Sequence, residues 1–227
     1  MSKQAEAIRV LIVDDHAVVR RGVRALLECE DDFSVVGEAC NGREAVDLAT
    51  ELEPDLVLMD LMMPEMGGGE AIARIRSANP DLAVVVFSSF VGEDELFPAI
   101  RAGAAGYLLK DGAPEDLLRG LRDAARGGMP LAPAAARRLM TEATRARVPL
   151  EPAVNELSKR EVEVLKVLTR GLSNRDIADR LYISEATVRS HVSSILRKLG
   201  VESRTQAALF ALRAGLVRVD ELDLPLD

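Results

Sequence analysis

The sequence predicts two domains of different class: an α/β domain with a doubly wound, five-stranded parallel sheet, followed by an all-α domain of four helices. Five short apolar runs alternate with amphipathic, helix-length stretches over residues 8–126. A segment with several prolines and glycines follows, and after residue 155 only helical periodicity is present. Strands separated by helices are typical of a parallel sheet, whereas proline and glycine clusters mark domain boundaries.

The five apolar runs have the length and the β-branched composition of buried strands. Near-continuous apolar strands of this kind occur in sheets that helices cover on both faces. The stretches between them carry apolar residues three and four positions apart, which indicates helices. The predicted strands are Ile8–Val13, Phe33–Ala39, Asp55–Met59, Leu82–Phe87 and Ala105–Leu109.

Polar side chains follow the predicted strands at the points where these strands end. Asp14 and Asp15 follow the first strand, Asp60 the third, Ser88 the fourth and Lys110 the fifth. Ligands bind at the carboxyl ends of strands in open parallel sheets, so we expect these five residues to converge there. Three carboxylates invite a hard divalent cation, and Mg²⁺ is usual where carboxylates and phosphate oxygens share a site. A nearby lysine can neutralise a phosphoryl group.

Four segments carry a resemblance to a known family: VDDH (13–16), DLVLMDLMMPEMGG (55–68), VVFSS (85–89) and GYLLKD (106–111). Together they resemble the flavodoxin-like receiver domain of two-component response regulators, in particular the NarL/FixJ class, over residues 8–126. The resemblance implies that a sensor histidine kinase phosphorylates Asp60. It also implies that Asp14, Asp15, Asp60 and the backbone carbonyl of Met62 hold Mg²⁺.

The resemblance implies a role for three further residues. Lys110 contacts the phosphoryl group, Ser88 moves toward it, and Tyr107 follows as an aromatic switch. Two features depart from the family pattern. The glycines at 67–69 raise the entropy cost of fixing the loop beside Asp60. Pro98 predicts that the fourth helix begins late, near Phe97, or is kinked.

Residues 127–154 form a predicted interdomain linker, in which Ala134–Arg147 can form a short helix. Charge differs across this boundary: residues 1–130 carry a net charge of −11, whereas residues 155–218 carry +5. This asymmetry hints at a basic binding module attached to an acidic domain. The acidic tail 219–227 is predicted to be a solvated end. Cys29 and Cys40 are predicted to be reduced thiols, and no signal peptide or membrane helix is expected.

The C-terminal part, residues 155–218, reads as four short helices. Three of them open with a serine followed three residues later by an acid or an amide, the pattern of a capping box. Ser184 opens the remaining helix, and Gly171 and Gly200 stand where helices should stop. The three predicted capping boxes are Ser158–Glu161, Ser173–Asp176 and Ser203–Gln206.

The helix after Ser184 suits the second helix of a helix-turn-helix. Its apolar residues are spaced to face inward, which turns a basic face of small residues outward. Such a face can enter the DNA major groove, where arginine reads guanine. The outward residues are Arg189, Ser190, Ser193 and Arg197. An ordinary solvated helix face would show the same periodicity.

Residues 157–211, LSKREVEVLKVLTRGLSNRDIADRLYISEATVRSHVSSILRKLGVESRTQAALFA, resemble the LuxR-type DNA-binding domain over essentially its full length. The resemblance implies that Glu185–Lys198 is the recognition helix and that the last helix, Ser203–Ala214, forms a dimer contact. Arg189 and Ser193 are then the expected base contacts, and Thr187 and Lys198 the expected phosphate contacts.

The sequence therefore predicts a cytoplasmic transcription factor rather than an enzyme. Its expected partners are a sensor histidine kinase, double-stranded DNA with paired half-sites, and a second copy of the chain once it is phosphorylated. Two alternatives stay open. One is a DNA-binding regulator that works without phosphorylation. The other is a phosphatase that forms an aspartyl-phosphate, although the stretch directly after Asp60, Leu61–Pro64, offers no second acid.

Overall fold

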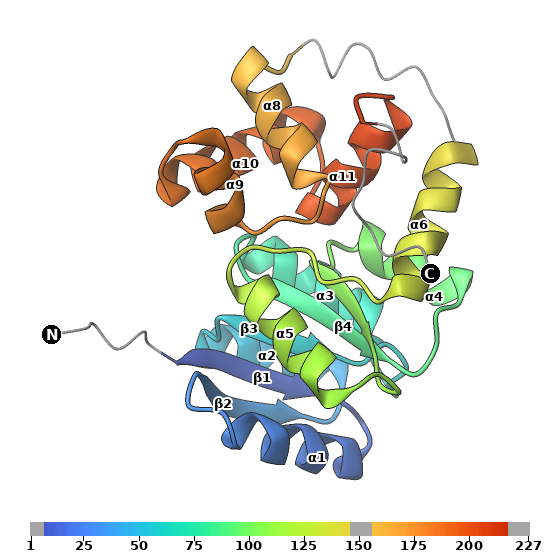
Figure 1. The fold of residues 1–227 in the computed structure, drawn as a ribbon. Helices are drawn as coiled ribbons and strands as arrows, with labels where there is room; N and C mark the ends of the chain where they lie inside the picture. Colours follow the sequence, from blue (N-terminus) through green and yellow to red (C-terminus); the bar gives the residue numbers. More distant parts are fainter. Residues whose placement is uncertain (1–6, 146–155, 218–227) are drawn as a thin grey trace, which may run out of the picture.

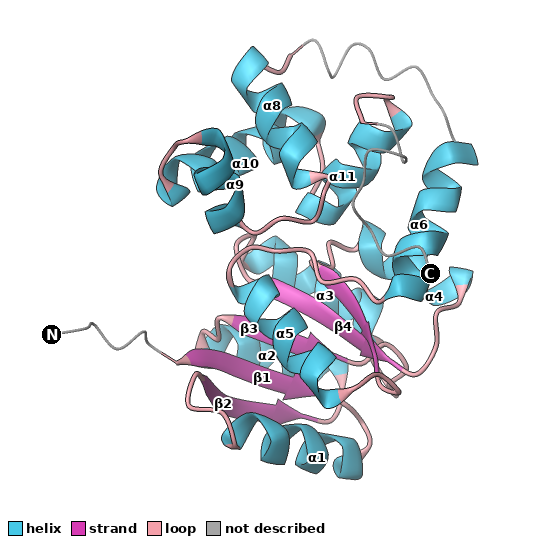
Figure 2. Cartoon of the chain, in the orientation of Figure 1, coloured by secondary structure: helices cyan, strands magenta, loops and turns pink. Residues whose placement is uncertain are grey.

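The computed structural model describes residues 7–145 and 156–217, and it contains two domains joined by a linker (Figure 1). The N-terminal α/β domain carries all five strands, and the C-terminal domain is helical (Figure 2). The predicted fold class is confirmed for both. Residues 146–154 of the predicted linker and the acidic tail lie outside the described residues.

The sheet has the strand order β2-β1-β3-β4-β5, and every pair is parallel. The bounds of three strands, β3, β4 and β5, differ by one residue from the predicted bounds. Ser88 is therefore the last residue of β4 rather than the residue after it. The carboxyl ends of β1 and β3 lie level, because their last residues, Val13 and Met59, pair with each other, whereas β4 runs two residues beyond the partner of Met59, from Val86 to Ser88. The strands are β1 (Ile8–Val13), β2 (Phe33–Ala39), β3 (Leu56–Met59), β4 (Ala83–Ser88) and β5 (Gly106–Leu109).

Helices cover both faces of this sheet, and alternate residues of each strand feed two separate cores. Leu11 and Val13 of β1 pack toward α2, α3 and α4, whereas Val10 and Ile12 pack toward α1 and α5. This alternation explains why the strands read as continuous apolar runs. The helices are α1 (Ala17–Glu28), α2 (Gly42–Leu52), α3 (Gly68–Ala78), α4 (Glu93–Arg101) and α5 (Pro114–Ala125).

Helix α4 contradicts the late start, one of the two alternatives predicted from Pro98, whereas the other alternative, a kink, stays a prediction. It begins at Glu93 and runs to Arg101 with Pro98 inside it, on the exposed side. Three acidic residues in the first turn, Glu93, Asp94 and Glu95, favour an early start because they interact with the helix dipole. Pro98 removes only one donor, the N–H that would reach the Asp94 carbonyl, and Asp94 is itself exposed.

The start of the linker is attached to the edge of the sheet. Tyr107 of β5 donates its backbone N–H to the Pro130 carbonyl at 2.8 Å and accepts from Ala132 N–H at 2.8 Å. Leu131 thereby forms a parallel bridge with Tyr107. The linker then enters helix α6 (Pro133–Arg145), so the predicted linker helix is confirmed over the described residues.

Four helices form the C-terminal domain around one apolar core. Capping boxes are present at Ser158 and Ser173, as predicted. Ser203 caps its helix through Gln206 N–H, but the side-chain amide of Gln206 does not complete a box and bonds elsewhere. The helices are α8 (Lys159–Leu168), α9 (Asn174–Leu181), α10 (Glu185–Leu199) and α11 (Arg204–Arg213). Among the described residues, no helix is long and apolar enough to cross a bilayer.

The glycine run beside Asp60 contains one position where a side chain cannot fit. A Cβ on Gly68 would overlap the Asp60 carbonyl, because Gly68 packs directly on that backbone and donates its N–H to the Leu61 carbonyl at 3.0 Å. A Cβ on Gly69 would meet no atom within 4 Å. Of the three glycines, only Gly68 is therefore required by close packing, and the entropy cost at Gly67 and Gly69 has no such reason.

We expect Gly69→Ala to raise the free energy of unfolding by about 0.5–1 kcal/mol, because alanine lowers the entropy of the unfolded chain in a helix. Gly68→Ala should lower it, since the β3–α3 loop must move away. Urea unfolding of the two variants checks this. Equal effects of the two substitutions would contradict the close packing at Gly68.

Candidate functional site

Three carboxylates gather at the carboxyl edge of the sheet, as the sequence predicts. The level ends of β1 and β3 bring Asp14 and Asp15 beside Asp60. Oxygen atoms of these three residues and a ring nitrogen of His16 lie within 4.8 Å of one another. Asp14 and Asp60 are buried, with only 2% and 4% of their surface exposed. Burying adjacent carboxylates costs free energy unless positive charge offsets them.

Lys110, which directly follows β5, supplies part of that positive charge. Its Nζ lies 2.6 Å from Asp14 Oδ2 and 2.9 Å from Asp60 Oδ2. Burial lowers the pKa of Lys110, but the bonds to Asp14 and Asp60 outweigh this and raise the pKa above its ordinary value. Three carboxylates against one ammonium leave two negative charges in excess. The oxygen donors and this excess fit a divalent cation such as Mg²⁺.

The backbone around the cluster fixes the carboxylates in place. Asp60 N–H donates to the Val13 carbonyl at 2.8 Å, and Leu61 N–H donates to Asp60 Oδ1 at 2.7 Å. His16 N–H donates to Asp14 Oδ1 at 2.8 Å, and its Nδ1 lies 2.7 Å from Asp15 Oδ1. The imidazole is largely exposed, so His16 bonds to the acidic pair at the rim of the cluster.

Ser88 and Tyr107 lie next to the cluster and are linked to each other through Phe90. Ser88 is buried, and its Oγ accepts from Phe90 N–H at 3.3 Å. The Tyr107 side chain is fully buried, and its hydroxyl donates to the Phe90 carbonyl at 2.7 Å. Burial raises the pKa of the Tyr107 hydroxyl. The loop that follows Ser88 is thus bonded through Phe90 to the strand that holds the linker.

In the C-terminal domain, helix α10 has the two faces that its periodicity predicts. Val188, Ile195 and Leu199 are buried in the domain core. The expected contact residues that face away from this core are exposed: Thr187, Arg189, Ser190, Ser193 and Arg197. Arg189 also pairs with Glu185 at 2.8 Å on the same helix.

Lys198 differs from the other expected DNA contacts, because its ammonium is held within the domain. Its Nζ lies 2.7 Å from Glu161 Oε2, and Ser194 Oγ donates to Glu161 Oε1 at 2.7 Å. Glu161 is also the third residue of the capping box of α8, where it accepts from Ser158 N–H. The bond to Lys198 is the main reason why the pKa of Glu161 falls to about 2. A buried carboxylate in α8 therefore orients the helix that sequence reasoning selected for DNA recognition.

Comparison with known proteins identifies both parts of the chain. The family described as "Response regulator receiver domain" matches residues 10–122, and "Bacterial regulatory proteins, luxR family" matches residues 155–211. The nitrate/nitrite response regulator protein NarL of Escherichia coli (strain K12) is 43% identical over 210 residues, which is 92% of this chain and 97% of NarL. The chain is a response regulator of the NarL/FixJ class. It is accordingly a DNA-binding transcription regulator and not an enzyme.

Further relatives share the two-domain organisation. The transcriptional regulatory protein YxjL of Bacillus subtilis (strain 168) is 42% identical over 94% of this chain and 99% of YxjL. Among solved structures, the response regulator ChrA of a heme-sensing two-component system aligns over 92% of this chain and 98% of its own, with 37% identity and a TM-score of 0.51. A structure of two RcsB dimers bound to DNA aligns over 92% and 99%, with 28% identity and a TM-score of 0.55.

Helix α10, the predicted recognition helix, faces the receiver domain of the same chain. Arg189, Ser190 and Ser193 of α10 line a cleft of about 500 Å³. The opposite wall comes from the receiver domain and includes Asp81 and residues 124–128. Reading bases requires a helix to enter a major groove about 8.5 Å deep. With the receiver domain across the cleft, a duplex cannot reach this face, so the structure is a closed form.

Helix α11 holds the closed form through three receiver carbonyls. Thr205 Oγ1 donates to the Ala105 carbonyl at 3.0 Å, and Gln206 Nε2 donates to the Ile100 and Arg101 carbonyls at 2.8 and 2.9 Å. From the receiver side, Arg76 donates to the Glu202 carbonyl. These residues carry no motif in the sequence, and the spacing of Gln206 from Ser203 predicts only a capping role.

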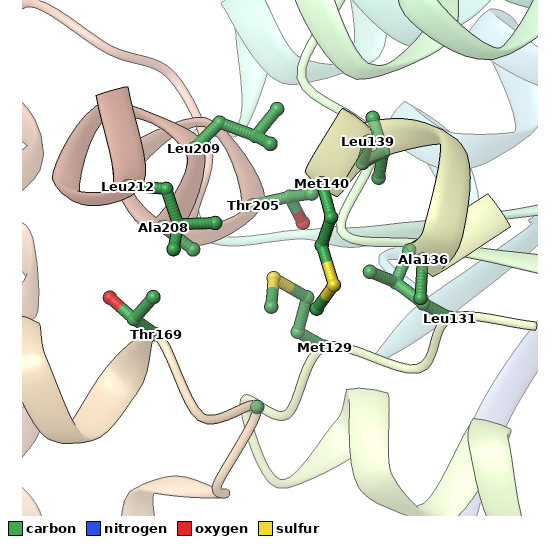
Figure 3. Close-up of a pocket in the computed structure, with 11 residues that line it drawn as sticks. Met129, Leu131, Ala136, Leu139, Met140, Thr169, Thr205, Ala208, Leu209 and Leu212 are labelled. Carbon is green, nitrogen blue, oxygen red and sulfur yellow. The ribbon is translucent and has the colours of Figure 1, made fainter. Parts of the chain in front are cut away.

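An apolar junction connects the linker helix to α11 (Figure 3). Leu139 and Met140 of α6 and Met129 before it face Leu209 and Leu212 of α11. A cavity of about 80 Å³ remains between them. Side chains do not fill this cavity, so the packing between the linker and α11 is incomplete here. Helix α11, the predicted dimer contact, is therefore covered by the linker within one chain.

We expect Glu161→Gln to destabilise the LuxR-type domain by about 1.5–3 kcal/mol at pH 7, because it removes charge-assisted bonds. The pKa of Glu161 is lowered on folding, so its contribution is present above the ordinary pKa near 4.5 and is lost as pH falls toward 2. The variant should therefore approach wild type near pH 2.

Hydrogen exchange of α8 and α10 amides between pH 7 and pH 2.5 measures this difference. Glu163→Gln, at an exposed ion pair with Arg160 on the same helix, is the matched control and should change little. A Glu161→Gln effect that is independent of pH would show that charge does not carry the interaction.

Proposed function

We propose that Asp60 accepts a phosphoryl group from a sensor histidine kinase. The observation that supports this is the group of three carboxylates around one ammonium at the carboxyl edge of the sheet, where Asp60 lies beside Lys110. We assign Mg²⁺ to Asp14, Asp15, Asp60 and the backbone carbonyl of Met62. The protein acts in the cytoplasm, where its partners in this scheme, a kinase and DNA, are found together.

The transfer follows from the chemistry of these residues. A carboxylate oxygen of Asp60 attacks the phosphorus, forming an O–P bond while the N–P bond to the donor histidine breaks. Lys110 lies within 2.9 Å of Asp60 and offsets charge on the phosphoryl oxygens. Mg²⁺, when bound, supplies further charge compensation. Leu61 N–H bonds Asp60 Oδ1 and Lys110 Nζ bonds Oδ2, so both oxygens of the carboxylate are held in place before the attack.

The phosphoryl group then provides new acceptor oxygens beside Ser88, whose Oγ now bonds Phe90 N–H. Moving Ser88 toward the phosphoryl group releases that bond and shifts the Phe90 carbonyl that Tyr107 holds. Tyr107 is in turn bonded to the linker through its backbone. The signal thus passes from Asp60 through β5 to the linker, α6 and α11.

The output is release of α10 and α11 from the receiver domain. Free α10 enters the major groove, with Arg189, Ser190 and Ser193 toward bases and Thr187 and Arg197 toward phosphates. Lys198 joins the phosphate contacts only if it leaves Glu161. Free α11 pairs with that of a second copy, which places two recognition helices on paired half-sites. Dimeric RcsB on DNA supports this arrangement by analogy.

Asp60→Asn should abolish phosphorylation by a small phosphodonor with Mg²⁺, as measured by intact mass. Wild type should gain one phosphate and bind a selected duplex at least tenfold more tightly. The matched control is Asp47→Asn, which alters an exposed carboxylate on α2 and should behave as wild type. A mass gain without tighter binding would support the alternative, a regulator whose DNA binding is independent of phosphorylation.

Thr205→Val should raise the DNA affinity of the unphosphorylated protein about fivefold, because one interdomain hydrogen bond contributes about 1 kcal/mol to the closed form. Thr50→Val removes an exposed hydroxyl from helix α2 of the receiver domain and is the control. Equal affinity of Thr205→Val and wild type, at fixed salt, would contradict the role of this bond in holding the domains together.

A further inference from the structure

Tyr182, at the turn between α9 and α10, presents a large aromatic side chain that contacts almost nothing. It is 95% exposed, the highest value among the large apolar residues of the described chain. It also ends α9 in a left-handed backbone conformation, with φ 54° and ψ 47°. Glycine or asparagine is usual at such a cap, because a Cβ is unfavourable there. Tyr182 therefore costs folding free energy without contributing packing.

The backbone of the turn around Tyr182 is held by several hydrogen bonds. Tyr182 N–H bonds the Ala178 carbonyl, and Ile183 N–H bonds the same carbonyl at 3.0 Å. Arg160 of α8 donates to the Leu181 carbonyl at 2.8 Å. Strain at an exposed and rigid position is the pattern of a functional residue rather than of a packing residue.

The neighbours of Tyr182 indicate what it contacts. Ser184, two residues on, caps α10, and its Oγ lies 2.8 Å from Thr187 Oγ1. Tyr182, Ser184 and Thr187 are all exposed, and together they place three hydroxyl groups at the N-terminal end of the recognition helix. Hydroxyl side chains beside a helix that enters the major groove commonly bond phosphate oxygens. The cleft that faces the receiver domain is lined by later residues of α10, so this end stays open in the closed form.

We propose that Tyr182 is a DNA-backbone contact, whose hydroxyl donates to a phosphate oxygen next to the groove that α10 occupies. The inference rests on the proposed docking of α10. Because the contact is made to the backbone and carries no charge, it strengthens binding to every sequence and leaves the salt dependence of binding unchanged.

The test compares Tyr182→Gly and Tyr182→Asn with wild type, all treated with phosphodonor and Mg²⁺. The DNA probes are a duplex selected by the wild-type protein from a random pool and a scrambled duplex of equal length. Both variants should bind both duplexes about threefold to tenfold more weakly, with an unchanged salt slope and no loss of thermal stability. Tyr182→Phe should lose as much affinity as Tyr182→Asn if the hydroxyl makes the contact.

Two controls separate this inference from the proposed function. Glu53→Gly replaces the left-handed cap of α2 in the receiver domain and should leave DNA binding unchanged. Arg189→Ala should weaken binding to the selected duplex only, and failure to select any duplex would count against the docking of α10 instead. Unchanged affinity of Tyr182→Gly and Tyr182→Asn for both duplexes would overturn the proposal.

Discussion

Repulsion among Asp14, Asp15 and Asp60 is the constraint on which the rest of this structure depends. The parallel sheet brings these carboxylates together, and Lys110 offsets only one of their three charges. A site with this excess attracts a cation and an incoming phosphoryl group but is costly to leave uncompensated. Gly68 packs closely against the Asp60 backbone and so helps to fix this carboxylate beside its neighbours. The chemistry is therefore prepared by the fold before any ligand arrives.

The contact between the domains is suited to being broken. It consists mainly of side chains donating to backbone carbonyls, at Ala105, Ile100 and Arg101, with an incompletely packed apolar junction beside them. Each such bond contributes on the order of 1 kcal/mol, which is within the range of free energies that couple two sites. A tightly packed apolar interface would be too stable for the free energy of one phosphorylation to open it and release the predicted recognition helix.

Much of the fold could be predicted from the sequence, because the spacing of apolar residues and the residues that cap or end helices are local signals. The strands were predicted within a residue of their observed bounds, and Ser158 and Ser173 cap their helices as their spacing indicates. Convergence of the acidic residues with Lys110 followed from the topology of a parallel sheet. The contacts between the domains could not be predicted. The spacing of Gln206 from Ser203 is the same whether its side chain caps a helix or bonds another domain. The late start predicted from Pro98 was wrong for a related reason. A proline leaves the carbonyl four residues earlier without its helical hydrogen bond, and here that residue, Asp94, is exposed. The left-handed turn at Tyr182 gave no signal, because the residue there is not glycine.

The pairing of residues 130–132 with β5 also determines where the receiver domain ends. The backbone N–H and carbonyl of Tyr107 bond Pro130 and Ala132, so the residues soon after the glycine pair at 127–128 belong physically to the sheet. These bonds ignore side-chain identity but fix the chain length between α5 and α6. In modular terms, the boundary for exchanging output domains lies beyond Ala132 and not at the glycines. A chimera cut at the glycines would lose residues 130–132 and with them the hydrogen bonds that connect Tyr107 of β5 to the following domain.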